Sequence, residues 1–179
     1  PDSNQFGGFN FMRTGQLNYA KFETDGYDLT ASYDFSVGEH MFQAEVMATK
    51  VEDNILFANP TDLSEQDPEL TEIKAPELAG NASLRYSKGP LVLRWRAQFV
   101  GEMLLGGVEQ ETYTTLYGPS VMMDDMWIHN LTGSFNVSDI TEVSFGIRNV
   151  TDEMPFVTEN AYPASPRGKT YWAGFNVQL

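Results

Sequence analysis

The chain has 179 residues and no cysteine, so neither a disulfide framework nor a thiolate metal site can form. Its formal net charge of -14 argues against nucleic acid as a partner, because the phosphates would be repelled. No apolar run approaches the roughly 18–20 residues of a membrane-spanning helix. The mean hydropathy of -0.33 does not exclude strands that cross a membrane, since alternating strands average to near neutrality.

Period-two alternation of apolar and polar residues is the dominant signal along the chain. It recurs in seven runs, at 17–35, 42–49, 76–87, 91–99, 127–136, 143–148 and 170–179. Gly26 interrupts the first run and indicates a bulge within one long strand. The sequence therefore predicts an all-β, antiparallel fold of about seven strands.

The connections between these runs alternate in length. Short turns are expected around Gly38, Gly89 and Asp139, with His40 assigned to the first of them. Long loops are expected at 55–75, 105–119 and 151–167. All short turns then fall at one end of the sheet, an arrangement that a soluble sandwich does not require. Short turns on one side and long loops on the other are typical of an outer-membrane barrel.

The first long loop is rich in proline and acidic residues, which predicts a solvated segment. A calcium site built from its carboxylates is the alternative. The Gly-centred spacing of an EF-hand loop is missing from it.

The two faces of the predicted strands differ in chemistry. Arginines fall on the polar face and fit a water-filled lumen, where charges pair across the interior. These predicted lumen-facing residues are Arg85, Arg94, Arg96 and Arg148. Aromatic residues gather near the short turns of the apolar face, as at a membrane interface. They are Tyr33, Phe35, Phe42, Tyr86, Phe135 and Phe175. The alternative is that the apolar face forms the core of a soluble sandwich.

Seven strands cannot close a barrel, because single-chain bacterial barrels have even strand numbers and leave no edge unpaired in lipid. We therefore expect the chain to be a fragment whose missing strands precede Pro1. Because each strand reverses the direction of the chain, the C-terminus is expected at the end of the sheet that carries the short turns.

Residues 141–156 resemble the penultimate strand and following loop of TonB-dependent outer-membrane receptors. The matching signature positions are Gly146, Asn149, Asp152, Pro155 and Phe156. Val150-Thr151 stands where the family usually has Leu-Phe, and the stretch 167–171 resembles the start of the last strand. Residues 17–35 resemble another long strand of the family, through Asn18, Ala20, Lys21 and Gly26, with Asp28 where Glu is common. Leu179 stands where the family usually ends in Phe.

The resemblance implies a 22-stranded barrel, of which residues 1–179 would form the C-terminal portion. The family binds a scarce nutrient outside the cell, and the inner-membrane TonB complex opens a path through a plug domain. Implied partners are outer-membrane lipid, the TonB complex through a plug absent from this chain, and a small-molecule or oligosaccharide ligand. Ferric siderophore, cobalamin, haem and oligosaccharide remain open as substrates. The implied localisation is the bacterial outer membrane, with a periplasmic C-terminus and extracellular long loops.

Catalytic chemistry finds no support, so we expect no enzyme activity and no cofactor. The two histidines, His40 and His129, lack ligand spacing, and no Gly-x-Ser-x-Gly elbow occurs. Met122, Met123 and Met126 beside two aspartates could contact a soft metal or haem, but loop packing is favoured and no metal site is predicted. Tyr113, Tyr117 and Trp127 are the candidate ligand contacts. The rival to the transporter is a soluble or surface β-sandwich that binds carbohydrate.

Overall fold

The computed structural model describes residues 21–57, 59, 61–106, 110–118, 121–156 and 162–178. These described residues form seven long strands, three two-residue strands and one short helix. In chain order the elements are β1 (Lys21–Val37), β2 (His40–Phe57), β3 (Asp67–Pro68), β4 (Leu78–Lys88), β5 (Leu91–Val100), β6 (Met103–Leu104), α1 (Gln110–Tyr117), β7 (Met122–Met123), β8 (Met126–Ser138), β9 (Thr141–Arg148) and β10 (Thr170–Val177). The predicted residues Leu17, Asn18, Ala20 and Leu179 lie outside the described part.

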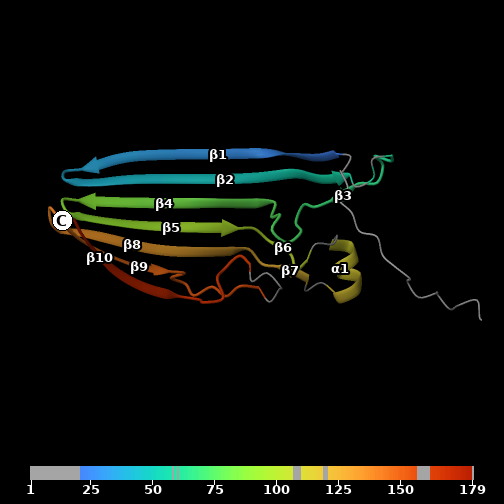
Figure 1. The fold of residues 1–179 in the computed structure, drawn as a ribbon. Helices are drawn as coiled ribbons and strands as arrows, with labels where there is room; N and C mark the ends of the chain where they lie inside the picture. The colour runs from blue at the N-terminus through green and yellow to red at the C-terminus, as the bar shows by residue number, and fades with distance from the viewer. Residues whose placement is uncertain are drawn as a thin grey trace, which may run out of the picture.

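The long strands form one sheet in the order β1-β2-β4-β5-β8-β9-β10, with β3 paired to β2 (Figure 1). Every pair of neighbours is antiparallel, so the chain passes back and forth across the sheet. The all-β, antiparallel prediction with seven long strands is confirmed.

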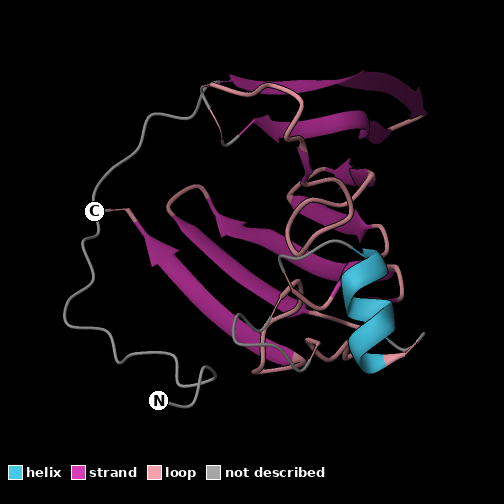
Figure 2. Ribbon diagram, turned by 90° about the vertical axis from the view of Figure 1, so that its right-hand side faces the viewer, coloured by secondary structure: helices cyan, strands magenta, loops and turns pink. Residues whose placement is uncertain are grey.

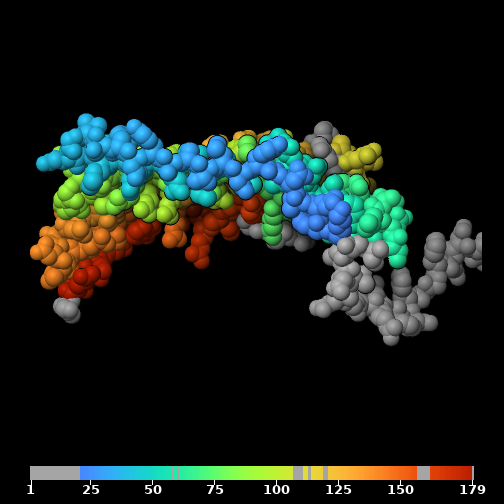
Figure 3. Space-filling model, turned by 90° about the horizontal axis from the view of Figure 1, so that it is seen from above, coloured from blue at the N-terminus to red at the C-terminus, as the bar shows by residue number. Residues whose placement is uncertain are grey.

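The sheet curves into an open arc (Figure 2). Seen from above, the red C-terminal strands lie to one side of the blue N-terminal strand (Figure 3). Among the described residues, β1 and β10 are the edge strands and do not pair with each other. The sheet is therefore not a closed barrel.

Three tight turns join strands at one end of the sheet, which we call the short-turn end. They lie between β1 and β2, β4 and β5, and β8 and β9. Gly38 and Gly89 adopt φ angles of 62° and 53°, which favour glycine in such turns. The amide of Gln178 donates to the carbonyl of Ile140, so β10 also ends there. The opposite end, where the longer connections emerge, is the long-loop end.

Some predicted boundaries are wrong. The β1–β2 ladder continues past the predicted end at 49, with Lys21 opposite Phe57, and it contains a register shift at the predicted bulge between Asp25 and Gly26. His40 is not a turn residue but the first residue of β2. The alternation of the two faces along β2 already begins at His40.

The loop predicted over 105–119 contains the helix α1. Residues 110–117 include neither Gly nor Pro, whereas Gly118 follows directly. Gly118 has a φ of 81° and its amide donates to the carbonyl of Thr114, which is a glycine cap at the helix C-terminus. Among the described residues, no helix combines the length and the apolarity needed to cross a bilayer.

Strand register sorts the side chains into two faces, because residues paired across strands point to the same side. The apolar face carries residues such as Tyr33, Phe35, Ala44, Leu84, Trp95, Leu131, Phe145 and Phe175. The polar face carries residues such as Ser32, Asp34, Gln43, Glu45, Arg85, Arg94, Arg96, Asn130, Thr132 and Arg148.

Candidate functional site

The apolar face exposes large hydrophobic side chains along the sheet. Tyr33, Phe145 and Phe175 are 69%, 45% and 81% exposed, and Leu29 and Val46 are exposed as well. A soluble monomer rarely exposes a contiguous apolar surface of more than a few hundred Å². The apolar face is therefore suited to contact with an apolar environment.

Aromatic rings cluster on the apolar face near the short-turn end. The ring centroids of Phe35 and Phe42 lie 4.7 Å apart, and those of Phe42 and Tyr86 lie 5.3 Å apart. Tyr33 stacks on Phe35 at 5.6 Å. Phe135 and Phe175 both pair with Val143, on either side of it, so they share this face. The structure thus brings the predicted aromatic set to one end of one face.

A second aromatic group lies on the apolar face of β5 and β8. The ring centroids of Trp127 and Phe99 lie 4.9 Å apart, and the His129 ring stacks on both Trp95 and Trp127. Nδ1 of His129 is buried and, within the described residues, has no hydrogen-bond partner. Trp127, a predicted ligand contact, lies in this aromatic group.

The other two candidate ligand contacts come from a different element. Tyr117 is an exposed residue of α1, at the long-loop end. Tyr113 belongs to the same helix, and its side chain lies outside the described residues. The three aromatic candidates therefore come from two separate elements, a helix and the start of β8.

The four predicted arginines share the polar face. Arg85 lies directly opposite Arg94 across β4 and β5, and Arg96 is the next residue of β5 on that face. Arg85 Nη1 donates a hydrogen bond of 3.0 Å to Oε1 of Gln43. Arg148 lies at the end of β9, opposite Thr170 of β10.

Arg85, Arg94 and Arg96 line a hollow of about 270 Å³ together with Asp34 and Glu45. Within the described residues, the ion pairs at the 4 Å limit involve lysines and not these arginines. Like charges placed directly opposite in an antiparallel pair are destabilising. With three arginines against two carboxylates, the hollow is a part of the polar face with an excess of positive charge.

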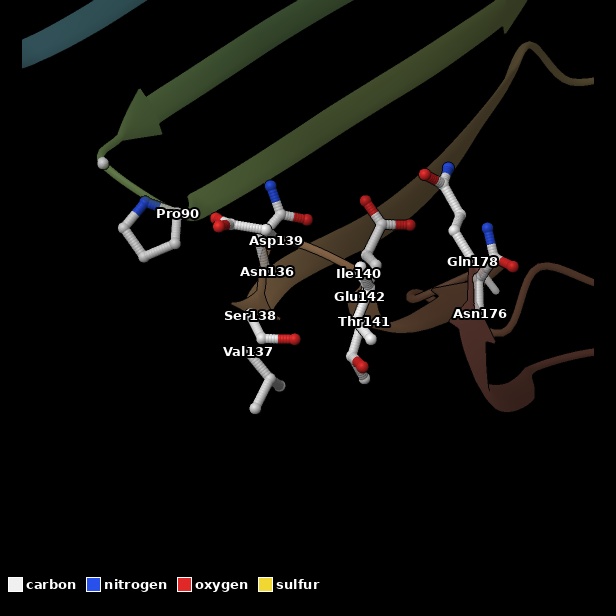
Figure 4. Close-up of a pocket in the computed structure, with 11 residues that line it drawn as sticks. Pro90, Asn136, Val137, Ser138, Asp139, Ile140, Thr141, Glu142, Asn176 and Gln178 are labelled. Atoms are coloured by element: carbon white, nitrogen blue, oxygen red, sulfur yellow. The ribbon is translucent and has the colours of Figure 1, made fainter.

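A larger polar hollow of about 700 Å³ lies at the short-turn end of the same face. Asn136, Glu142, Asn176 and Gln178 point to its side, whereas Val137 and Thr141 point away (Figure 4). These residues come from β8, β9, β10 and the position directly after β10, so the alternation of face persists to the strand ends. The short-turn end of the polar face is thus lined by amides and carboxylates.

Long connections pack together at the opposite end. Val100, Met103 and Met123 form one buried cluster, with Ile73, Leu105, Phe156 and Tyr162 against it. Met126, Ile128 and Ala164 form a second, which also contacts Phe156. Met123 and Met126 therefore lie in apolar packing, which agrees with the interpretation favoured over a soft-metal site.

Asn149 organises the connection after β9. It is 4% exposed and adopts a φ of 53°, which Asn tolerates better than most residues. Its side-chain amide donates to the Glu153 carbonyl at 2.8 Å, and its Oδ1 accepts from the Glu153 amide at 2.9 Å. Its own backbone N–H donates to Oδ1 of Asn130 on β8. Asn149 thus closes a turn and ties it to the sheet.

Asp152 links that turn to the last strand. It has a φ of 62°, and its Oδ1 accepts a 2.6 Å hydrogen bond from the backbone N–H of Lys169, just before β10. Gly146 allows close packing on the polar face, because an added Cβ would lie 2.5 Å from Nε1 of Trp172. Pro155 follows the Asn149–Glu153 turn. These signature residues shape the β9–β10 connection.

The acidic loop between β2 and β4 forms local turns. Hydrogen bonds from the hydroxyl and the backbone N–H of Ser64 hold the pKa of Asp62 below its usual range. Across the described residues, no group of three acidic or histidine side chains is arranged to hold a metal ion.

Sequence reasoning missed one polar group on the apolar face. His40 Nδ1 lies 2.9 Å from Oη of Tyr86, and Lys88 Nζ lies 3.4 Å from Nε2 of His40. The signal was available, because continuing the alternation of β2 back through His40 puts its side chain on the apolar face.

Comparison of the chain with protein-family models, with curated proteins and with solved structures returned no match.

Proposed function

We propose that this chain forms the C-terminal part of the barrel of a TonB-dependent outer-membrane receptor, which takes up a scarce nutrient. The observation that carries the proposal is the sorting of side chains by register. One face of seven antiparallel strands carries exposed apolar side chains, and the other carries polar and charged ones. Lipid outside and water inside is the arrangement that a transmembrane barrel requires.

Strand length and connection length support the same proposal. A transmembrane strand needs about 9–11 residues. Strands β1, β2, β4, β5 and β8 have at least 10, and β9 and β10 have 8 each. Every tight turn of the sheet lies at one end, together with the end of β10. In the proposed receptor that end is periplasmic and the long-loop end is extracellular. The unpaired edges of β1 and β10 would pair with further strands of the barrel.

The β9–β10 connection supports the resemblance to the receptor family, because residues at the signature positions have a structural role in it. Asn149 and Asp152, two of the signature positions, adopt left-handed backbone angles and bond across the connection. A signature with this role sets the path of an extracellular loop. The ligand stays within the four classes that the resemblance implies, namely ferric siderophore, cobalamin, haem and oligosaccharide.

The rival sandwich would need a second sheet stacked on the apolar face. In the described part of the chain, the second sheet consists only of β6 and β7, with two residues each. Phe145 and Phe175, which a sandwich would bury, are exposed. We therefore favour the receptor barrel over the β-sandwich.

The membrane placement is tested by single cysteines along β1, from Asp28 to Phe35, in the full-length protein. Residues 1–179 contain no cysteine, so within them each substituted residue carries the one spin label, and any cysteine elsewhere in the full-length protein is replaced by serine. In bilayers, labels at Leu29, Ala31 and Tyr33 should favour collision with oxygen, and labels at Thr30 and Ser32 with a water-soluble nickel complex. Uniform access of the nickel complex to all positions would refute the proposal.

The uptake itself has a genetic test. A strain lacking the receptor and a strain lacking TonB should share the same defect in accumulating one of the four ligand classes. A receptor-dependent uptake that persists without TonB would contradict the energised mechanism while leaving the barrel intact.

A further inference from the structure

A polar triad interrupts the apolar face at the short-turn end. It consists of Lys88 at the end of β4, His40 at the start of β2 and Tyr86 of β4. Lys88 Nζ lies 3.4 Å from His40 Nε2, and His40 Nδ1 lies 2.9 Å from Tyr86 Oη. Lys88 is exposed and the other two are half-buried.

The chemistry of these groups fixes the direction of their hydrogen bonds. A lysine ammonium only donates, so Nε2 of His40 accepts from Lys88. The neutral imidazole then carries its proton on Nδ1, which donates to Tyr86 Oη. The Tyr86 hydroxyl hydrogen and two N–H groups of Lys88 have no further acceptor among the described residues. The triad therefore presents donors and a positive charge, the complement of an anionic oxygen.

An apolar hollow of about 320 Å³ adjoins the triad on the same face and shares Tyr86 with it. Its other main lining side chains are Leu84, Leu93, Trp95, Leu131, Phe145 and Ile147. Register puts the side chains of the remaining lining residues Arg94 and Thr132 on the polar face. The hollow thus offers hydrocarbon and aromatic contacts next to a cationic group.

We propose that this surface binds one anionic phospholipid from the leaflet that meets the short turns. The phosphate accepts hydrogen bonds from Lys88 and Tyr86, and an acyl chain lies in the apolar hollow. The inference rests on the proposed function, because it requires the apolar face to lie in a bilayer.

The position of Lys88 distinguishes it from the other described lysines on this face, Lys21 and Lys50. Lys21 forms an ion pair with the carboxylate of Glu23. Lys50 lies toward the long-loop end and is within 4 Å of the carboxylates of Glu52 and Glu77. Lys88 has no carboxylate within that distance among the described residues. An anionic headgroup is therefore the complement that Lys88 lacks.

Fluorescence quenching of Trp95 by brominated lipid tests the site, because Trp95 lines the hollow. The full-length receptor is placed in phosphatidylcholine bilayers that contain a small fraction of brominated phosphatidylglycerol or brominated phosphatidylcholine. The difference in signal between the protein and its Trp95→Phe variant isolates Trp95. We expect phosphatidylglycerol to associate about fivefold more strongly, the effect of one lysine near an anionic lipid surface.

Lys88→Gln should bring the ratio of the two lipids to about one. Lys169→Gln, a matched change just before β10 at the long-loop end, should keep the preference. Equal quenching by both lipids in the unaltered protein, or a preference that survives Lys88→Gln, would overturn the site and leave the membrane placement standing. No quenching of Trp95 by either lipid would overturn the membrane placement and the site with it.

Discussion

Replacement of Asn149 gives the sharpest test of how the β9–β10 connection is held. Asn149→Ala removes both side-chain hydrogen bonds to the Glu153 backbone. It also places an alanine at a left-handed φ of 53°, which alanine adopts less readily than asparagine. Each lost hydrogen bond costs about 1 kcal/mol net. The left-handed conformation costs an alanine about 1 kcal/mol more. The turn should therefore lose about 3 kcal/mol of local stability.

Two further substitutions at the same position separate these contributions. Asn149→Gly removes the hydrogen bonds but accepts the positive φ, so it should cost about 2 kcal/mol. Asn149→Asp keeps an acceptor for the Glu153 amide and loses only the donor, so it should cost about 1 kcal/mol. The expected order of stability is Asn, Asp, Gly and then Ala.

Hydrogen exchange of the full-length protein measures this order. A loss of 3 kcal/mol corresponds to an exchange rate about 150-fold faster at the Glu153 amide, if local opening limits exchange. The Lys169 amide, which donates to Asp152, should respond in the same direction. Equal protection in the Ala and Gly variants would refute the role of the backbone angle. Unchanged protection in all three would refute the turn altogether.

The remaining predictions concern a glycine in the sheet and a carboxylate in the acidic loop. An added Cβ at Gly133 would lie 2.5 Å from Cζ of Phe145, so Gly133→Val should lower stability by about 1–3 kcal/mol. Urea denaturation should show that Phe145→Leu recovers part of this loss, and strictly additive effects would contradict the contact. Ser64→Ala should raise the pKa of Asp62, because the hydroxyl that stabilises its charged form is removed. Because folding lowers the pKa of Asp62, its carboxylate stabilises the fold at pH values above the pKa that this group has in the unfolded chain. This stability is lost as the pH falls through the pKa of the folded chain. Carbon NMR of the Asp62 carboxyl should follow this shift, and an unchanged titration would contradict the bond.

Alternation predicted the sheet well because its information is local. Each strand residue points to one of two sides, so a run such as that of β5 fixes its own faces without knowledge of the partner strand. The short turns were equally readable, since Gly38 and Gly89 occupy positions that need a positive φ. In the sheet, successive long strands are neighbours, so the predicted turns and loops join adjacent strands.

The long-loop end was harder to predict because its contacts join distant residues. Ile73, Val100, Met123 and Phe156 come from four separate connections or strand ends and meet in one cluster. No local period brings such residues together. The extension of β2 to Phe57 failed for a related reason, because it depends on pairing with Lys21 on another strand.

The triad at the other end was missed for a different reason. His40 follows Gly38-Glu39, which reads as a turn, and only the register against Lys88 reveals its partner. The arginines, by contrast, were predictable as a set, since alternation alone puts them on one face. Alternation does not say that Arg85 and Arg94 stand directly opposite each other, because that pairing depends on register.

The distribution of buried residues suggests that two regions of the fold depend on different surroundings. At the long-loop end, apolar side chains from several connections bury one another, as in an ordinary protein core. Over the middle of the sheet, the described side chains of the apolar face remain largely exposed, although they are as hydrophobic. Backbone ladders alone contribute little net free energy in water, since the unfolded chain bonds to water instead. If the proposed membrane placement holds, hydrocarbon supplies the missing burial, and the spin-label alternation along β1 should vanish when the bilayer is replaced by denaturant. A sheet that keeps its two-sided pattern without any apolar solvent would show that this reasoning about its stability is wrong.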